Sequence, residues 1–115
     1  SIFAGSTSGS AGSTNGTGTE ALFNGPTDIT TDGTNLFVAD KGNNAIRKIV
    51  ISTGAVTLFA GSSTGASGST DGTGTAALFS GPSGITTDGT NLYVSDAGNN
   101  SIRKIVISTA AVTTL

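Results

Sequence analysis

Short apolar runs separated by turn-forming residues recur along the whole chain. In the first half, "TDITT" and "LFVAD" are joined by "DGTN", while "AIRKIVIST" and "AVTLFAG" follow the turns "KGNN" and Gly54. The runs are rich in β-branched and aromatic residues, and Gly and Asn tolerate the positive φ angles of tight turns. Three successive hairpins of this kind predict an all-β unit, a four-stranded antiparallel meander.

Neither face of these predicted strands is polar. In "IRKIVI", residues 46–51, alternate side chains face opposite sides, and each side receives isoleucine or valine. Strands that are apolar on both sides belong to sheets covered on both sides. A stack of similar sheets meets this requirement, and stacking them around an axis produces a β-propeller.

The meander occurs twice. Phe3 falls on Phe59 at an offset of 56 positions, and 14 of the 55 residue pairs from there to Thr57 differ, which leaves 41 identical. Such a period indicates a repeat architecture in which one unit cannot bury its faces alone. We expect residues 25–60 and 81–115 to form two blades, residues 1–24 to hold a strand remnant and a crossing loop, and residues 61–80 to form a second crossing loop. Within the first loop, Thr19–Phe23 is expected to form one short turn.

The second unit, "GPSGITTDGTNLYVSDAGNNSIRKI", resembles the NHL repeat, with its P-x-G-[IV], D-x-x-G-N-[LI]-[YF]-V-[AS]-D and N-x-x-[IV] segments. The first unit matches similarly, but Asp28 stands where the pattern has glycine. The stretch "DGTGTAALF" also resembles a bacterial subgroup of NHL proteins. The resemblance implies a propeller with one repeat per four-stranded blade, commonly with six blades. The matching residues of the second unit are Pro82, Gly84, Ile85, Asp88, Leu92, Tyr93, Val94, Asp96, Asn99 and Ile102.

Two blades cannot close a ring, because propellers contain about 4 to 8. A free pair would expose two apolar faces, which soluble monomers rarely tolerate. Either the chain is a fragment, natural or engineered, of a longer protein, or copies assemble head to tail. Ser1–Gly5 aligns with Thr57–Gly61, and Thr113–Leu115 aligns with Thr57–Phe59, so the last strand of one copy ends where the next copy resumes. We therefore expect a homo-oligomer, with a trimer of six blades favoured over a tetramer.

Composition narrows the chemistry. The chain has no histidine and no cysteine, which excludes Ser-His-Asp and Cys-His nucleophile systems and histidine-based zinc sites. Some propellers that resemble NHL proteins are metal-dependent lyases, but their histidine ligands have no counterpart here. We expect no enzyme activity, no catalytic residue, no metal and no cofactor.

Charge and hydropathy limit the classes of partner that the chain is expected to bind. The net charge is −2, and the basic residues are Lys41 and two Arg-Lys pairs, so no basic patch for nucleic acid is expected. No run approaches the roughly 18 apolar residues of a membrane span. The absence of cysteine leaves the compartment open, and an extracellular or cell-surface position in a bacterium is the one that we favour.

The aspartates are the first candidates for chemistry. Asp40 and Asp96 each end a strand before a tight turn, and we expect them to accept backbone N–H groups of that turn rather than to act as acids or bases. A calcium site at Asp32 and Asp88 would need clustered oxygens, but "TDGTN" lacks the alternating Asp series and a following Glu. Both are interpreted as turn-stabilising residues.

Arg47 and Arg103 begin the third strand of each unit. A functional interpretation makes them clamps for an anion, while the structural one, which we favour, pairs each with an aspartate such as Asp40 or Asp96. The neighbouring asparagines are interpreted mainly as turn residues, of a type that accepts left-handed backbone geometry: Asn43, Asn44, Asn99 and Asn100.

One end of the blades is the candidate binding face, because turns and crossing loops emerge there together and loops on rigid scaffolds commonly hold binding residues. It carries Lys41, Asn43, Asn44, Asn99 and Asn100. The favoured function is a non-catalytic scaffold or interaction module that assembles with itself. The alternative is a surface module of a secreted bacterial protein that binds a glycan or a peptide.

Overall fold

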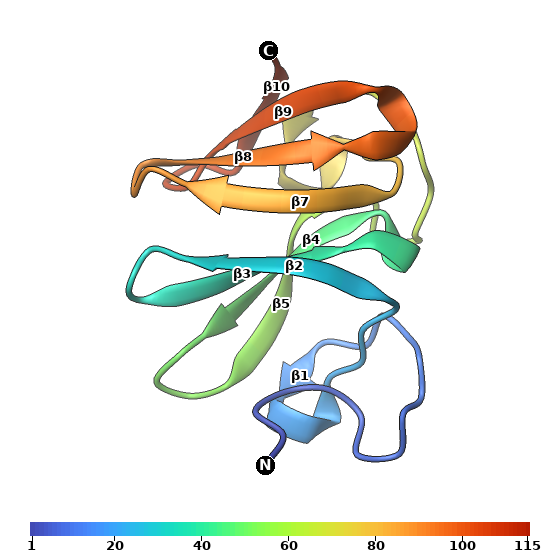
Figure 1. Cartoon of the computed structure of the whole chain (residues 1–115), viewed down its shortest axis with the longest axis vertical. Coiled ribbons are helices and arrows are strands. Elements are labelled where there is room, and N and C mark those ends of the chain that lie inside the picture. Colours follow the sequence, from blue (N-terminus) through green and yellow to red (C-terminus); the bar gives the residue numbers. More distant parts are fainter.

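The computed structural model describes residues 1–115 and contains two antiparallel β-sheets, one for each repeat (Figure 1). The strand order is β1-β5-β4-β3-β2 in the first sheet and β6-β10-β9-β8-β7 in the second. The first sheet consists of β1 (Gly16–Thr17), β2 (Pro26–Thr31), β3 (Asn35–Asp40), β4 (Ala45–Val50) and β5 (Ala55–Gly61). The second consists of β6 (Gly72–Thr73), β7 (Pro82–Thr87), β8 (Asn91–Asp96), β9 (Ser101–Val106) and β10 (Ala111–Thr114).

Each blade has five strands rather than the four expected from the sequence. The fifth comes from the crossing loop, where Gly16 pairs with Val56 in one sheet and Gly72 pairs with Val112 in the other. The outer edge of a four-stranded sheet carries unpaired N–H and C=O groups, and the loop satisfies some of them as it passes. The short turn expected at Thr19–Phe23 is a 3₁₀ turn that begins one residue earlier, at Gly18–Glu20.

Only the second asparagine of each predicted turn is left-handed. Asn44 and Asn100 have φ angles of 52° and 54°, whereas Asn43 and Asn99 end short 3₁₀ turns. All four asparagines thus lie in or next to the turns, and the left-handed geometry is confined to the second of each pair. The side chains of Asn43 and Asn99 instead donate hydrogen bonds to Asp40 and Asp96 and to carbonyl oxygens of the crossing loops.

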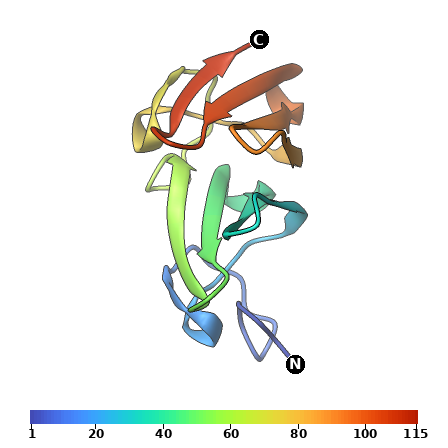
Figure 2. The ribbon, with the colours of Figure 1, turned by 90° about the vertical axis from the view of Figure 1, so that its left-hand side faces the viewer.

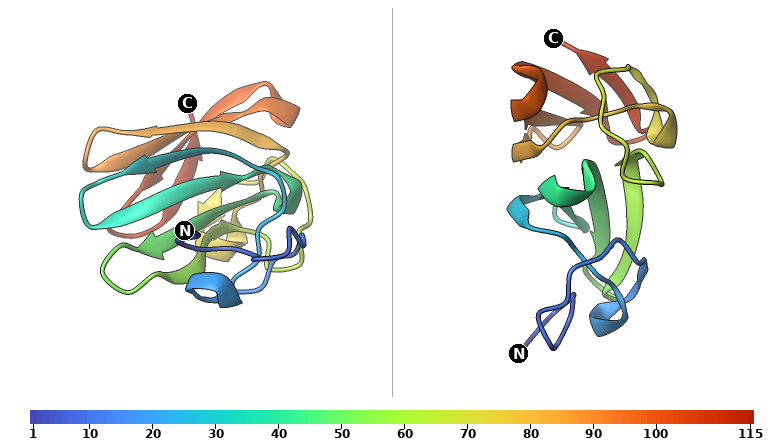
Figure 3. Two further views of the ribbon diagram at one scale, coloured as in Figure 1. Left: turned by 60° about the horizontal axis from the view of Figure 1, so that its bottom comes forward. Right: turned by 90° about the vertical axis from the view of Figure 1, so that its right-hand side faces the viewer.

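The two sheets stack face to face, and β2 and β7 lie side by side (Figures 1 and 2). The core cluster between them takes one aromatic, one isoleucine and two alanine side chains from the first blade and mostly aliphatic ones from the second. The two termini lie at opposite ends of the stack (Figure 3). No helix in the structure has the length and apolar character that crossing a lipid bilayer requires. The cluster consists of Phe37, Ala39, Ile46, Ala60, Ala77, Phe79, Ile85, Leu92, Val94, Ile105 and Val112.

Replacing Ala110 by glycine is expected to raise the free energy of unfolding by about 1 kcal/mol, because left-handed backbone strains any residue with a Cβ atom. Ala110 has a φ of 63°, and Gly54 occupies the same place in the first repeat with a φ of 75°. The matched variant Gly54→Ala should lower the free energy of unfolding by a similar amount. Urea denaturation measures both changes. If Ala110→Gly leaves the free energy of unfolding unchanged, the left-handed backbone at Ala110 is not strained.

Candidate functional site

A buried arginine ties the first blade to its crossing loop. Arg47 on β4 is 1 % exposed, and its Nη1 donates to Asp40 Oδ2 at 2.9 Å and to the carbonyl oxygen of Leu22 at 2.8 Å. Its Nη2 donates to the Thr14 carbonyl at 3.1 Å and to Asn15 Oδ1 at 3.0 Å. Such a set of charge-assisted hydrogen bonds fixes a loop that has little apolar surface of its own.

Asp40 binds both the turn and the end of the loop. Its Oδ1 accepts the backbone N–H of Asn24 at 2.8 Å, and its Oδ2 accepts the Asn43 side-chain amide at 2.7 Å. The same amide donates to the Gly12 carbonyl at 2.8 Å. The expected backbone donor in the turn itself is replaced by one from the crossing loop, because the fully buried carboxylate lies between the two segments.

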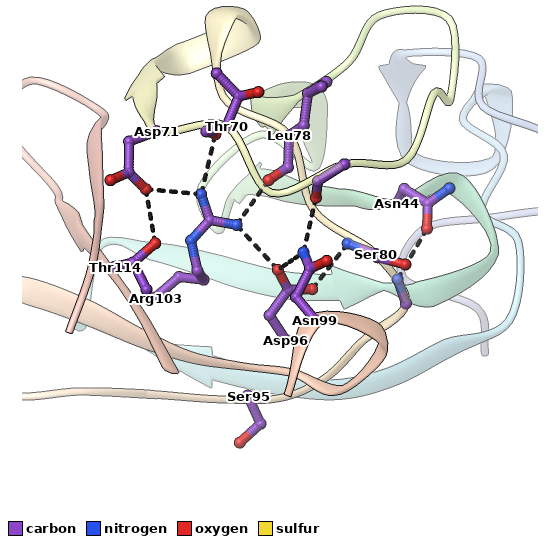
Figure 4. Close-up of polar contacts among 12 residues, drawn as sticks. Asn44, Thr70, Asp71, Leu78, Ser80, Ser95, Asp96, Asn99, Arg103 and Thr114 are labelled. Carbon is purple, nitrogen blue, oxygen red and sulfur yellow. Dashed lines mark hydrogen bonds and ion pairs between the residues drawn. The ribbon is translucent and has the colours of Figure 1, made fainter. Parts of the chain in front are cut away.

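The second blade repeats the network around Arg103 (Figure 4). Its Nη1 donates to Asp96 Oδ2 at 2.9 Å and to the Leu78 carbonyl at 2.7 Å. Its Nη2 reaches the Thr70 carbonyl at 3.0 Å and Asp71 Oδ1 at 3.0 Å, so a second carboxylate stands where the first blade has an amide.

Asp71 also accepts the hydroxyl of Thr114 at 2.8 Å. This hydroxyl, and then the Arg103 guanidinium, hold the pKa of Asp71 below its ordinary value. Asp96 completes the parallel, since it accepts the Ser80 N–H at 2.8 Å and the Asn99 amide at 2.7 Å. The side chains that the sequence made candidates for acid–base or anion chemistry are thus engaged with one another and with the loops.

Each buried guanidinium also lies over an aromatic ring. The Cζ atom of Arg47 is 4.9 Å from the centroid of the Phe23 ring, and that of Arg103 is 4.9 Å from the Phe79 ring. The Nε atoms of both arginines are buried without a hydrogen-bond partner. Cation–π attraction to the ring stabilises each buried guanidinium, whose Nε–H group has no hydrogen-bond acceptor.

The aspartates of the "TDGTN" turns hold the turn backbone. Asp32 Oδ1 accepts the N–H groups of Thr34 at 3.0 Å and Asn35 at 2.9 Å. The Asn35 N–H is the main cause that lowers the pKa of Asp32. In the second repeat, the N–H of Asn91 has the same effect on the pKa of Asp88.

The candidate binding face divides into engaged and free side chains. Asn43 and Asn99 belong to the networks, and Asn99 donates to the Gly68 carbonyl at 2.7 Å. Lys41 and Asn100 are exposed. The sequence analysis missed the loop partners Thr14, Asn15, Thr70 and Asp71. Asn15 and Asp71, at the same offset in loops of mostly Gly, Ser and Thr, were an available signal, whereas Thr14 and Thr70 act through carbonyl groups and gave none.

Asn44 instead forms part of the contact between the two blades, which we call the internal joint. Its Oδ1 accepts the Gly81 N–H at 2.8 Å and its Nδ2 donates to the Gly65 carbonyl at 3.0 Å. At the inner edge of the sheets, Asp28 Oδ2 accepts the Ile85 N–H at 2.9 Å. Asp28 therefore contributes to the joint at the place where the NHL pattern has glycine.

Each blade has one face with no second blade against it, although the N-terminal segment and the crossing loop cover part of the first one. The first open face is a groove on the first blade lined by Phe3, Phe23, Ile29, Leu36, Val38 and Ile49. The second open face, on the second blade, consists of Tyr93, Ser95, Ile102 and Leu115.

Repeat copies of these residues lie in the internal joint. Ile29 is 52 % exposed but its copy Ile85 is 6 % exposed, and Ile102 is 45 % exposed but its copy Ile46 is fully buried. The copies of all positions of the two open faces belong to the core cluster or pack against it, although Val38 and Ile49 are themselves already buried within the first blade. The residues of the two open faces are thus repeat copies of the residues that the two blades contribute to the internal joint.

Comparisons with known proteins place the fold but not a family. No family model matches the chain, and no curated protein matches it. A solved protein of unknown function from Bacteroides thetaiotaomicron is 31 % identical with a TM-score of 0.79, over 96 % of this chain and 27 % of that one. An auxiliary nutrient binding protein from the same organism is 27 % identical with a TM-score of 0.81, over 99 % of this chain and 28 % of that one.

A second auxiliary nutrient binding protein, from Bacteroides ovatus, is 24 % identical with a TM-score of 0.74, over 92 % of this chain and 26 % of that one. This likeness concerns the fold alone. The chain therefore spans about a quarter of the length of these solved structures. Its fold is all-β, with two propeller-like blades.

Proposed function

We propose that the chain is a non-catalytic scaffold, an NHL-type pair of blades that joins further copies of itself head to tail. The observation that carries this proposal is that the apolar residues of each open face are the repeat copies of residues buried in the internal joint. A contact between the second open face of one copy and the first open face of another would repeat a joint that already exists inside the chain. Such heterologous contacts generate rings when the rotation closes.

Native mass in solution tests this proposal. Light scattering over a range of concentrations is expected to show a species of three copies, which corresponds to six blades; four copies would correspond to eight. A chain that stays monomeric at every concentration contradicts self-assembly. The matched control is Ile102→Asp, which places a charge on the second open face and should yield monomers.

A second candidate function is the binding of a glycan or a peptide on the loop end of the blades. The likeness to an auxiliary nutrient binding protein at 27 % identity favours it, as do the exposed side chains of Lys41 and Asn100 on that end. Titration calorimetry with soluble glycans and peptides would identify such a ligand, and the double variant Lys41→Ala and Asn100→Ala would then bind it more weakly.

A further inference from the structure

A small hollow lies between the two crossing loops at the loop end of the first blade. Its volume is about 100 Å³, whereas a single ordered water needs only about 10–15 Å³ of such space. The hollow therefore admits a group larger than a water molecule. None of its lining residues belongs to either open face. They include Ser13 and Asn15 of the first loop, Arg47 and Leu58 of the blade, and Ser62 and Ser63 of the second loop.

Arg47 brings a buried N–H group that no atom of the chain satisfies. Its two Nη groups donate four hydrogen bonds, so the Nε–H is the one donor of the guanidinium that is left over. In the planar guanidinium, Nε–H and Nη2 lie along the same edge, and Nη2 donates to Asn15, which lines the hollow. The free donor therefore lies on the side of the hollow, where a ligand oxygen that accepts from it removes the cost of an unsatisfied buried group.

The other polar groups around the hollow can also donate. Because arginine only donates, the Asn15 atom that faces Arg47 must be its oxygen, and the Asn15 Nδ2 group keeps its own N–H donors. The hydroxyls of Ser13 and Ser63 form no hydrogen bond within the chain, and no acidic residue lines the hollow. A set of donors with one charged member suits a group that only accepts, such as a carboxylate.

The second blade shows that such a guanidinium accommodates a further carboxylate. Arg103 forms ion pairs with both Asp96 and Asp71, whereas Arg47 forms one, with Asp40. The pair around Arg47 has no net charge, while one guanidinium and two carboxylates give the group around Arg103 a net charge of −1. A carboxylate bound beside Arg47 would therefore give the first blade the charge balance that the second blade already has.

The hollow lies where the second blade has its additional polar groups. Figure 4 shows Asp71 and Thr114 on the same side of the Arg103 guanidinium, where the Thr114 hydroxyl donates to Asp71. Their copies in the first blade are Asn15 and Leu58, and both line the hollow. An amide and an apolar side chain thus replace the carboxylate and the hydroxyl, and the first blade leaves space beside its arginine.

We propose that this hollow binds the carboxylate of a small molecule. Its oxygens accept the Nε–H of Arg47 and the Nδ2 group of Asn15, and the hydroxyls of Ser13 and Ser63 donate from the two loops. The charged donor makes these hydrogen bonds stronger than neutral ones, and Leu58 offers an apolar wall to the rest of the molecule. The inference goes beyond the proposed scaffold function and does not rest on it, because every lining residue belongs to one chain.

Nuclear magnetic resonance tests this inference, because Arg47 and Arg103 are the only arginines and give the only two Nε–H signals. Titration with sodium acetate at constant ionic strength is expected to shift the Arg47 signal until it saturates. The dissociation constant should be about millimolar, since so small a ligand gains little binding energy. The Arg103 signal is the internal control and should not move. An Arg47 signal that never saturates, or an equal shift of both signals, would overturn the proposal.

Further probes separate the charge of the ligand from its source. Acetamide has nearly the shape of acetate without the charge, and it should bind about tenfold more weakly; equal binding would contradict a carboxylate site. Glucuronate and N-acetylglycine carry the same carboxylate on a sugar and on a peptide end. Tighter binding of one of them than of acetate assigns the ligand to that class, and equal binding of all three assigns it to small carboxylates in general.

Variants of the lining residues locate the binding. Asn15→Asp is expected to weaken acetate binding by about tenfold, because it replaces an amide donor by a negative charge. The variant should fold, since its copy Asp71 is already an aspartate. Ser63→Ala should weaken binding by about threefold, whereas the matched control Ser52→Ala, in an exposed turn at the other end of the blade, should not change it. Acetate binding by Asn15→Asp that equals the wild-type value would overturn the role of the hollow.

Discussion

Replacing Phe79 by alanine is expected to lower the free energy of unfolding by about 3–5 kcal/mol, because the ring is fully buried between the blades and its removal leaves a cavity. Its repeat copy, Phe23, is only half-buried, on the first open face. Phe23→Ala should therefore cost the monomeric chain clearly less. Urea denaturation at a concentration where a single copy predominates measures both variants.

The comparison of these two phenylalanines also depends on assembly. Where copies associate as proposed, Phe23 is covered by a neighbour, and the costs of Phe79→Ala and Phe23→Ala should converge as the protein concentration rises. Equal costs in the monomeric chain would show that the first open face is covered from within, contrary to the structure.

Replacing Asp40 by alanine is expected to lower the free energy of unfolding by about 3–5 kcal/mol, because it leaves the buried guanidinium of Arg47 without a carboxylate. The matched variant Asp96→Ala should cost less. Arg103 keeps an ion pair with Asp71 at 3.0 Å, although the exposure of that carboxylate limits how much the ion pair stabilises the fold. Chemical denaturation of the two single variants gives the difference directly.

Two further variants control this comparison. Lys41→Ala removes an exposed charge that forms no ion pair and should leave the free energy of unfolding nearly unchanged. Asn15→Asp, introduced together with Asp40→Ala, recreates the second carboxylate of the other blade and should restore part of the lost stability. Equal costs for Asp40→Ala and Asp96→Ala would mean that Asp71 contributes nothing to its network.

The strands of both blades were predictable because their signals are local. Alternating β-branched residues and the "DGTN" turns locate β2 and β3, and the turn at Asn44 starts β4. The fifth strands were not predictable, since "GT" at Gly16–Thr17 has no pattern within a loop of Gly, Ser and Thr. Its strand conformation depends on pairing with β5, a contact distant in sequence.

The candidate site was predictable in part for a similar reason. The pairing of Arg47 with Asp40 follows from two strands joined by a tight turn, and the hairpin register brings the two residues within reach. The remaining ligands of the guanidinium are carbonyl oxygens of the crossing loop, such as that of Thr14. Every residue carries a carbonyl group, so no residue type marks those positions in advance.

Asp28 distinguishes the internal joint from the proposed joint between copies. Its carboxylate accepts a backbone N–H of β7 inside the chain, whereas the copy of Asp28 is Gly84, which has no side chain to accept the corresponding N–H of a neighbour. The second open face also carries Tyr93 and Ser95 where the internal joint has Phe37 and Ala39. In the proposed assembly, the stronger internal joints and the weaker joints between copies would therefore alternate around the ring. Dilution would dissociate the joints between copies first, and rings would exchange whole two-blade chains with one another without unfolding them.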